Sequence, residues 1–263
     1  MTHLGRIALL AVVLSLVAVE GVAAAPPPAL WGTNFETGAF EAYKNTIRMG
    51  GAGVYATRSI TTEQARTGTK SMKIVMPPST SASGAANYQL VANMPSGTEG
   101  TDLWYGWSVR LGNDWNLAQV VDNASYFMGQ GGFRYLGTSV NGPGANPGVD
   151  SHLPGRWSIG LNLTNTVGGD DAQQRDLGPI VKNVWKDFVF HVKWSSGTDG
   201  VWEVWTDGVK VGPTYVGRTL GTAGATFEHR QGLYQGSKVD HTRTLYIDNH
   251  RVGTSYAAVD PSN

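Results

Sequence analysis

The sequence predicts an all-β fold in which two antiparallel sheets pack face to face, a β-sandwich of the jelly-roll type. Apolar and polar residues alternate with a period of two along much of the chain, and helical periodicity is nearly absent. The 263 residues include 35 glycines, which suits many tight turns. Short antiparallel strands joined by turns form sandwiches or barrels.

Residues 1–24 are expected to be a signal peptide, and residues 25–263 a single β domain. Arg6 precedes the almost wholly apolar run Ile7–Val19, and Val22-Ala23-Ala24 supplies small residues of the kind that signal peptidase recognises. The apolar run is too short to cross a bilayer as a helix, and no later run is long enough. We therefore expect a secreted protein without a membrane anchor.

The strands follow one another along the chain, each marked by alternation. In one run, Tyr105 and Trp107 share the face expected to be buried, and Trp104 lies on the other face. The dipeptide Asp207-Gly208 between two apolar runs predicts a tight hairpin. The clearest alternating runs are residues 103–111, 157–164, 187–194, 201–205, 209–211 and 245–252.

Composition narrows the function classes. The chain contains no cysteine, so it has no thiol nucleophile and no cysteine-ligated zinc. The formal net charge is +0 and there is no basic tract, which argues against a nucleic-acid partner. We expect a monomer that binds neither nucleic acid nor membranes.

Polar residues at alternate strand positions carry the predicted chemistry. If residues 229–235 form a strand, Arg230, Gly232 and Tyr234 share one face. Gly232 would leave an empty place in which a sugar ring could lie. By the same alternation, two further segments contribute Gln130, Asn87 and Gln89.

This combination of residue types suits cleavage of a uronic-acid polymer by β-elimination. A base removes the proton at C5, the C4–O bond breaks, and donors from Arg, Gln or Asn offset the carboxylate charge in the transition state. A tyrosine can remove the proton and then protonate the leaving oxygen, once a nearby Arg lowers its pKa from about 10. Tyr234 is therefore the candidate base and acid, although a packed tyrosine is the alternative interpretation.

Several segments resemble the jelly-roll polysaccharide lyases, a concanavalin A-like group that includes the glucuronan lyases and the heparin lyase type. The resemblance spans most of the chain, and the order of its segments is more specific than any single motif. It implies that the Gly-x-Tyr pattern supplies the catalytic tyrosine, Tyr234, and that a central-strand glutamine, Gln130, neutralises the substrate carboxylate. Arg230 stands where alginate lyases of similar fold carry Lys. The segments are residues 34–38, 104–109, 184–195, 203–208, 232–234 and 245–249.

The chain departs from the family pattern at one histidine. The family often has a His near the glutamine or on an early strand, but Gly131-Gly132 follows Gln130 here, and the early strand begins Asn87-Tyr88. His152 or His229 could replace the missing residue; action on another uronate and loss of activity are the alternative interpretations. The predicted substrate-binding set is Asn87, Gln89, Trp104, His152 and His229.

The other histidines are interpreted as structural. His191 lies within an alternating run and is expected to pack in a strand. His241 and His250 are expected at the surface or at a strand edge.

The resemblance also implies a structural Ca²⁺ on the side away from the catalytic residues. Glu36 lies near the first strand and Asp248 on the last, and these strands pair in such folds, which would bring two hard oxygen ligands together. Ordinary strand-end carboxylates are the alternative. No organic cofactor is expected.

Two other functions compete with a secreted lyase that acts on an acidic, glucuronan-type polysaccharide. A glycoside hydrolase needs two carboxylates about 5–10 Å apart; Glu203 and Asp207 are the closest pair, but Asp207 belongs to the predicted turn. A non-catalytic carbohydrate-binding module would stack sugars on tryptophans. Its candidates are Trp104, Trp115 and Trp202.

Overall fold

The computed structural model describes the chain in ranges that cover most of residues 25–263. The predicted signal peptide, residues 1–24, lies outside the described residues. Within them the chain forms sixteen strands and one short helix, and no helix there is long and apolar enough to span a membrane. The described ranges are residues 25, 27–40, 42–50, 56–78, 86–95, 97–117, 121–129, 136–141, 155–161, 173–221, 223–224, 227–235 and 240–263.

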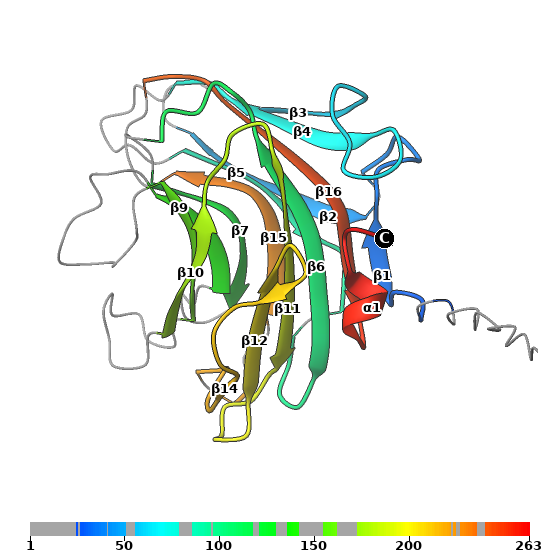
Figure 1. Ribbon diagram of the computed structural model, residues 1–263, viewed down its shortest axis with the longest axis vertical. Coiled ribbons are helices and arrows are strands. Elements are labelled where there is room, and N and C mark those ends of the chain that lie inside the picture. Colours follow the sequence, from blue (N-terminus) through cyan, green and yellow to red (C-terminus); the bar gives the residue numbers. More distant parts are fainter. Residues whose placement is uncertain are drawn as a thin grey trace, which may run out of the picture.

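Two antiparallel sheets form the sandwich (Figure 1). The nine-stranded sheet has the order β13 (Val209–Lys210), β12 (Val201–Thr206), β11 (Trp185–Lys193), β6 (Asp102–Leu111), β16 (Arg243–Gly253), β4 (Ser71–Met76) and β3 (Thr57–Thr61), with β1 (Trp31–Thr33) on β16 and β14 (Tyr215–Val216) on β12. The seven-stranded sheet has the order β10 (Gln173–Pro179), β9 (Arg156–Leu161), β8 (Leu136–Asn141), β7 (Val121–Gly129), β15 (Phe227–Gln235), β5 (Ala86–Ala92) and β2 (Tyr43–Gly50). The helix α1 (Tyr256–Val259) packs on β16 and β6. The predicted jelly-roll sandwich is confirmed.

The core lies between the two sheets and is built by the alternation seen in the sequence. Tyr105 and Trp107 of β6 are fully buried, as is Phe188 of β11, and Trp157 of β9 meets Phe188 edge to face from the other sheet. Burying each such side chain contributes roughly 1.5–3 kcal/mol. The inward positions predicted for these strands are confirmed.

The predicted hairpin at Asp207-Gly208 is also confirmed. Asp207 and Gly208 have φ of 47° and 80°, so both central residues of the turn lie in the left-handed region, as a type I′ turn requires. The turn joins β12 to β13, with Thr206 opposite Val209.

A bulge in β16 decides which of its side chains enter the core. The register between β16 and β6 shifts between Asp248 and Arg251, and Asn249 has a φ of 49°. Asp248 and Asn249 both bond to the outer loop at residues 66–67, so the next residue, His250, turns inward and is fully buried. The prediction that His250 lies at the surface or an edge is therefore wrong, because the extra residue changes the alternation.

Candidate active site

The central strand β15 presents different residues to its two faces. His229, Gln231 and Leu233 are all 0% exposed and point into the core. Arg230 and Gly232, which alternate with them, therefore belong to the outer face of the seven-stranded sheet. We call the part of this face formed by β5, β15 and β7 the candidate face.

Arg230 contacts a buried amide on the neighbouring strand. Its Nη1 donates to Oε1 of Gln89 on β5 at 3.4 Å, and Gln89 is only 1% exposed. The Nε2 of Gln89 has no hydrogen-bond partner among the described residues. A buried donor without an acceptor costs about 1–3 kcal/mol. Because this nitrogen is itself buried, the partly exposed Arg230 is the group of the pair that a ligand can reach.

The strand register places Tyr234 between two asparagines. Position 234 lies opposite Asn87 on β5 and opposite Asn123 on β7. Asn87 was predicted, whereas Asn123 was not, because strand pairing between distant segments leaves no mark in the sequence. Both asparagines occupy register positions opposite residue 234.

Gly232 has a role other than the predicted empty place. The β15–β7 register shifts between Gln231 and Tyr234, and Gly232 has a φ of 136°. A Cβ at this position would lie 2.1 Å from the carbonyl oxygen of Tyr88. The glycine is thus required by a bulge and by the close approach of the β5 backbone.

Two predicted substrate-binding residues do not lie on the candidate face. His229 points into the core and bonds to His250. Trp104 lies on the outer side of the nine-stranded sheet, where its ring stacks on His191 with centroids 4.3 Å apart. The assignment of both residues to this site is corrected, because His229 alternates with Arg230 and Trp104 belongs to the other sheet. Gln130 and His152 lie outside the described residues.

The residues that the two rival functions need also lie elsewhere. Trp115 and Trp202 are 1% and 0% exposed, so neither offers a surface for sugar stacking. Glu203 lies on β12 of the nine-stranded sheet, where it bonds to His191 and Lys210. Asp207 sits in the hairpin turn of the same sheet.

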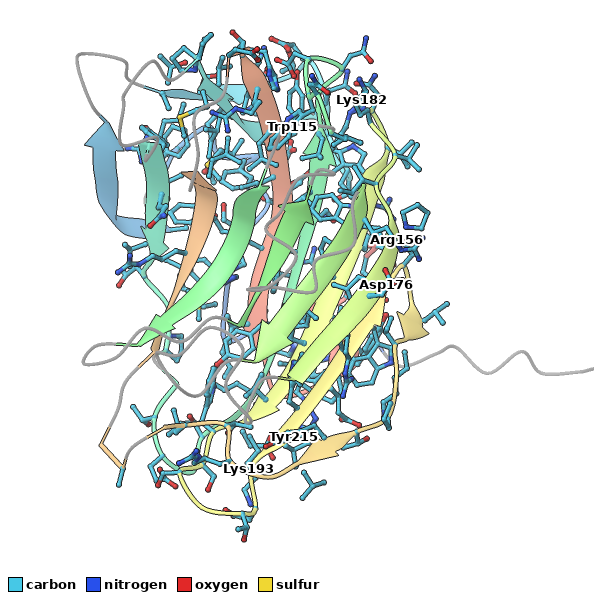
Figure 2. All side chains as sticks on the ribbon, turned by 90° about the vertical axis from the view of Figure 1, so that its left-hand side faces the viewer. Trp115, Arg156, Asp176, Lys182, Lys193 and Tyr215 are labelled. Atoms are coloured by element: carbon cyan, nitrogen blue, oxygen red, sulfur yellow. The ribbon has the colours of Figure 1, made fainter. Side chains whose placement is uncertain are left out.

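A second arginine on this sheet is already paired. Trp157 and Ile159 point inward, so Arg156 lies on the outer face, and its Nη2 is 2.7 Å from Oδ2 of Asp176. Figure 2, which looks toward the seven-stranded sheet, shows the two side chains together at its β9–β10 edge. Such a partly exposed ion pair contributes little to stability.

Glu36 and Asp248 border the same loop, residues 66–70. Glu36 accepts hydrogen bonds from the backbone N–H groups of Thr69 and Lys70, which lower its pKa. Asp248 is fully buried and accepts a hydrogen bond from the backbone N–H of Arg66 at 2.8 Å. Burial raises the pKa of Asp248 to about 6, and the like charge of Glu36 adds to the rise.

Carboxylate oxygens are donors of the chemical type that calcium accepts, although those of Glu36 and Asp248 already accept hydrogen bonds in this structure. The two carboxylates border one loop and repel each other, and in the described part of the chain no cationic side chain bonds to Asp248. The guanidinium of Arg66 instead pairs with Asp187. No group of three or more His, Cys, Asp or Glu suited to a metal occurs among the described residues, so further ligands would have to be neutral oxygens, which calcium accepts.

Comparison with known proteins agrees with the architecture. A family model described as polysaccharide lyase matches residues 35–251. The structure is similar to an endo-beta-1,4-glucuronan lyase from the fungus Trichoderma reesei, with a TM-score of 0.57 and 21% identity over 84% of this chain and 99% of that chain. It is also similar to the catalytic domain of a glycoside hydrolase family 131 protein from Coprinopsis cinerea, with a TM-score of 0.58 and 14% identity over 89% and 98%.

A third similar structure is the cellulose induced protein Cip1, with a TM-score of 0.53 and 16% identity over 85% of this chain and 97% of that chain. At these identities the likeness establishes the fold. No curated protein matches the chain.

Proposed function

Because the chain belongs to the polysaccharide lyase family, we propose that it cleaves a uronic-acid polysaccharide of the glucuronan type by β-elimination, outside the cell. The observation that carries the chemistry is the Arg230–Gln89 pair on the candidate face. It combines a cation with a buried amide, and Gln89 lies two residues along β5 from Asn87, which pairs with Tyr234. Charge neutralisation and a proton carrier are the two parts that this reaction needs.

Arg230 would bind the substrate carboxylate and stabilise the transition state. When the C5 proton leaves, its bonding electrons spread toward the carboxylate, which gains negative charge. Arg230 is partly exposed and its guanidinium is oriented by Gln89, so it can donate to that developing charge without rearranging. One donor of this kind contributes roughly 10²–10³-fold in rate.

Tyr234 would move the proton. Its phenolate takes the C5 proton, the electron pair of the C5–H bond becomes the C4=C5 double bond, and the C4–O bond breaks. The electron pair of that bond stays on the leaving oxygen, which takes a proton from the tyrosine hydroxyl. Atoms and charges balance without a redox partner or an added water, and general acid–base catalysis of this kind contributes roughly 10²–10⁴-fold.

The finer features of the proposal have separate support. The glucuronan type is supported by the similar structure of a glucuronan lyase. Action outside the cell is supported by the apolar run Ile7–Val19 and the small residues after it. We further propose that Glu36 and Asp248 hold a structural Ca²⁺, which would offset their mutual repulsion.

Ultraviolet absorbance tests the proposed reaction, because only elimination creates the conjugated product. The purified protein is incubated with glucuronan, alginate, ulvan and a heparin-type polymer, and absorbance and reducing ends are followed together. We expect both to rise with glucuronan. Reducing ends without absorbance would indicate a hydrolase, and polymer binding without either would indicate a carbohydrate-binding module.

A further inference from the structure

A chain of polar rings crosses the hydrophobic core behind the candidate face. Nδ1 of His229 and Nε2 of His250 share a hydrogen bond of 2.7 Å, and Nδ1 of His250 lies 3.3 Å from the hydroxyl of Tyr43. His229 belongs to β15 and His250 to β16, so the bond joins the central strand of one sheet to the opposite sheet. Both histidines are 0% exposed.

The surroundings hold both rings in place. The ring centroid of Trp107 lies 4.7 Å from that of His229, and the centroid of Trp31 lies 4.8 Å from that of His250. Burial lowers the pKa of His229 well below its ordinary value and that of His250 to about 3. Each neutral imidazole has one N–H donor and one acceptor nitrogen. One ring can therefore donate to the other while both stay neutral.

The bond acts on β15 close to a bulge in its pairing with β7. Directly after His229 comes Arg230, and between Gln231 and Tyr234 the pairing with β7 is interrupted by the bulge. Apolar contacts are non-directional and permit a strand to slide or tilt, whereas a short hydrogen bond fixes distance and angle. The histidine pair therefore supplies a directional anchor across the core, close to the point where the pairing of β15 with β7 shifts while its pairing with β5 continues.

We propose that the His229–His250 hydrogen bond sets the position of the β15 residues on the candidate face, which makes His250 a positioning residue for the lyase reaction although it touches no substrate. The inference rests on the proposed function for its kinetic consequence. Its structural consequence, the immobilisation of β15, is independent of the substrate.

The kinetic test compares two substitutions of His250 with a control. His250→Leu removes the bond, and His250→Gln places an amide near the position of Nε2. Because small misplacements of reacting groups cost up to about 10²-fold, we expect His250→Leu to lower kcat about tenfold to hundredfold with little change in KM. His250→Gln should recover most of the lost kcat.

Ile247→Ala is the matched control, because Ile247 lies on the same strand, points inward and is 0% exposed, but has no polar group. We expect it to lower the melting temperature while kcat stays near the wild-type value. Wild-type kcat in His250→Leu would overturn the inference, and so would an equal loss of kcat in Ile247→Ala. If His250→Leu does not fold, His229→Leu takes its place because it breaks the same hydrogen bond from the other strand, and a kcat indistinguishable from wild type would then overturn the inference.

Hydrogen exchange separates this inference from the proposed function. Backbone amides of β15 should exchange faster in His250→Leu than in His250→Gln or Ile247→Ala, at equal distance below each melting temperature. If the wild type releases no unsaturated product from any polymer, the proposed function fails while this comparison still decides the positional claim. Unchanged exchange of β15 in His250→Leu, or in His229→Leu where that variant stands in for it, would overturn the positional claim.

Discussion

Gln89 accepts a hydrogen bond from Arg230 across the β5–β15 pair, while its own amide nitrogen has no partner among the described residues. The same side chain thus contacts the cation and carries a second, buried donor that has no acceptor among the described residues. Natural proteins pair most of their buried polar groups, so an unpaired one calls for an explanation in terms of function. The partly exposed guanidinium of Arg230 is the group of this pair that a substrate carboxylate would contact.

Gln89→Leu should therefore impair catalysis more than stability. The substitution removes both the oxygen that accepts from Arg230 and the unpaired amide nitrogen of Gln89. Hydrogen bonds to charged groups contribute about 1.5–3 kcal/mol, so kcat/KM on glucuronan should fall roughly tenfold to hundredfold. Initial rates of absorbance increase measure the loss, and thermal melting checks that the variant is folded.

Gln231→Leu is the control for that experiment. Gln231 is also a fully buried glutamine, and both of its amide atoms lack partners within the described ranges, but it faces the core from β15. We expect wild-type kcat/KM and a melting temperature that is not lowered, since an unpaired buried amide is removed. If both glutamine variants lose activity equally, the two faces of the sheet do not differ as described.

Gly232→Ala should destabilise the protein through a direct backbone collision. The new Cβ would meet the Tyr88 carbonyl oxygen at 2.1 Å, and overpacking of this kind costs about 1–3 kcal/mol. Gly100→Ala is the control, because Gly100 also has a positive φ, 80°, but nothing lies within 4 Å of its Cβ position. Denaturant melts of both variants measure the difference. A Gly232→Ala protein no less stable than Gly100→Ala would contradict the bulge geometry.

Calcium should stabilise the Glu36–Asp248 region. Because a ligand that binds only the folded state raises the free energy of unfolding, a chelator should lower the melting temperature and excess Ca²⁺ should restore it. Glu36→Gln removes one charged ligand and should abolish the response to chelator. A wild-type melting curve that is indifferent to chelator at every concentration would reject the site.

Local alternation predicted the core well, because burial on one face of a strand leaves a period of two in the sequence. Tyr105 and Trp107 of β6 were placed inward on that basis and are fully buried. The Asp207-Gly208 turn was equally visible, because few other dipeptides accept two consecutive positive φ values. The pairing of the first and last strands, with Thr33 opposite His250, also agrees with expectation.

The errors arose where the structure depends on bulges and on distant pairing. The bulge at Asn249 turns His250 into the core, and no sequence period signals it. Alternation alone could have excluded His229 from the candidate face, since it is adjacent to Arg230. Alternation correctly placed Trp104 and Trp107 on opposite faces of β6. It could not show that β6 belongs to the nine-stranded sheet, whereas the candidate face belongs to the seven-stranded sheet.

The most direct test of the account is the rate at which Tyr234→Phe releases unsaturated product from glucuronan. The substitution keeps the ring but removes the hydroxyl that must carry the proton, so the variant should fold while turnover falls roughly 10²–10⁴-fold. The absorbance of the unsaturated uronate measures turnover, and a melting curve of the same variant shows whether it is folded. A folded Tyr234→Phe protein that works at the wild-type rate would contradict the assignment of Tyr234 as base and acid.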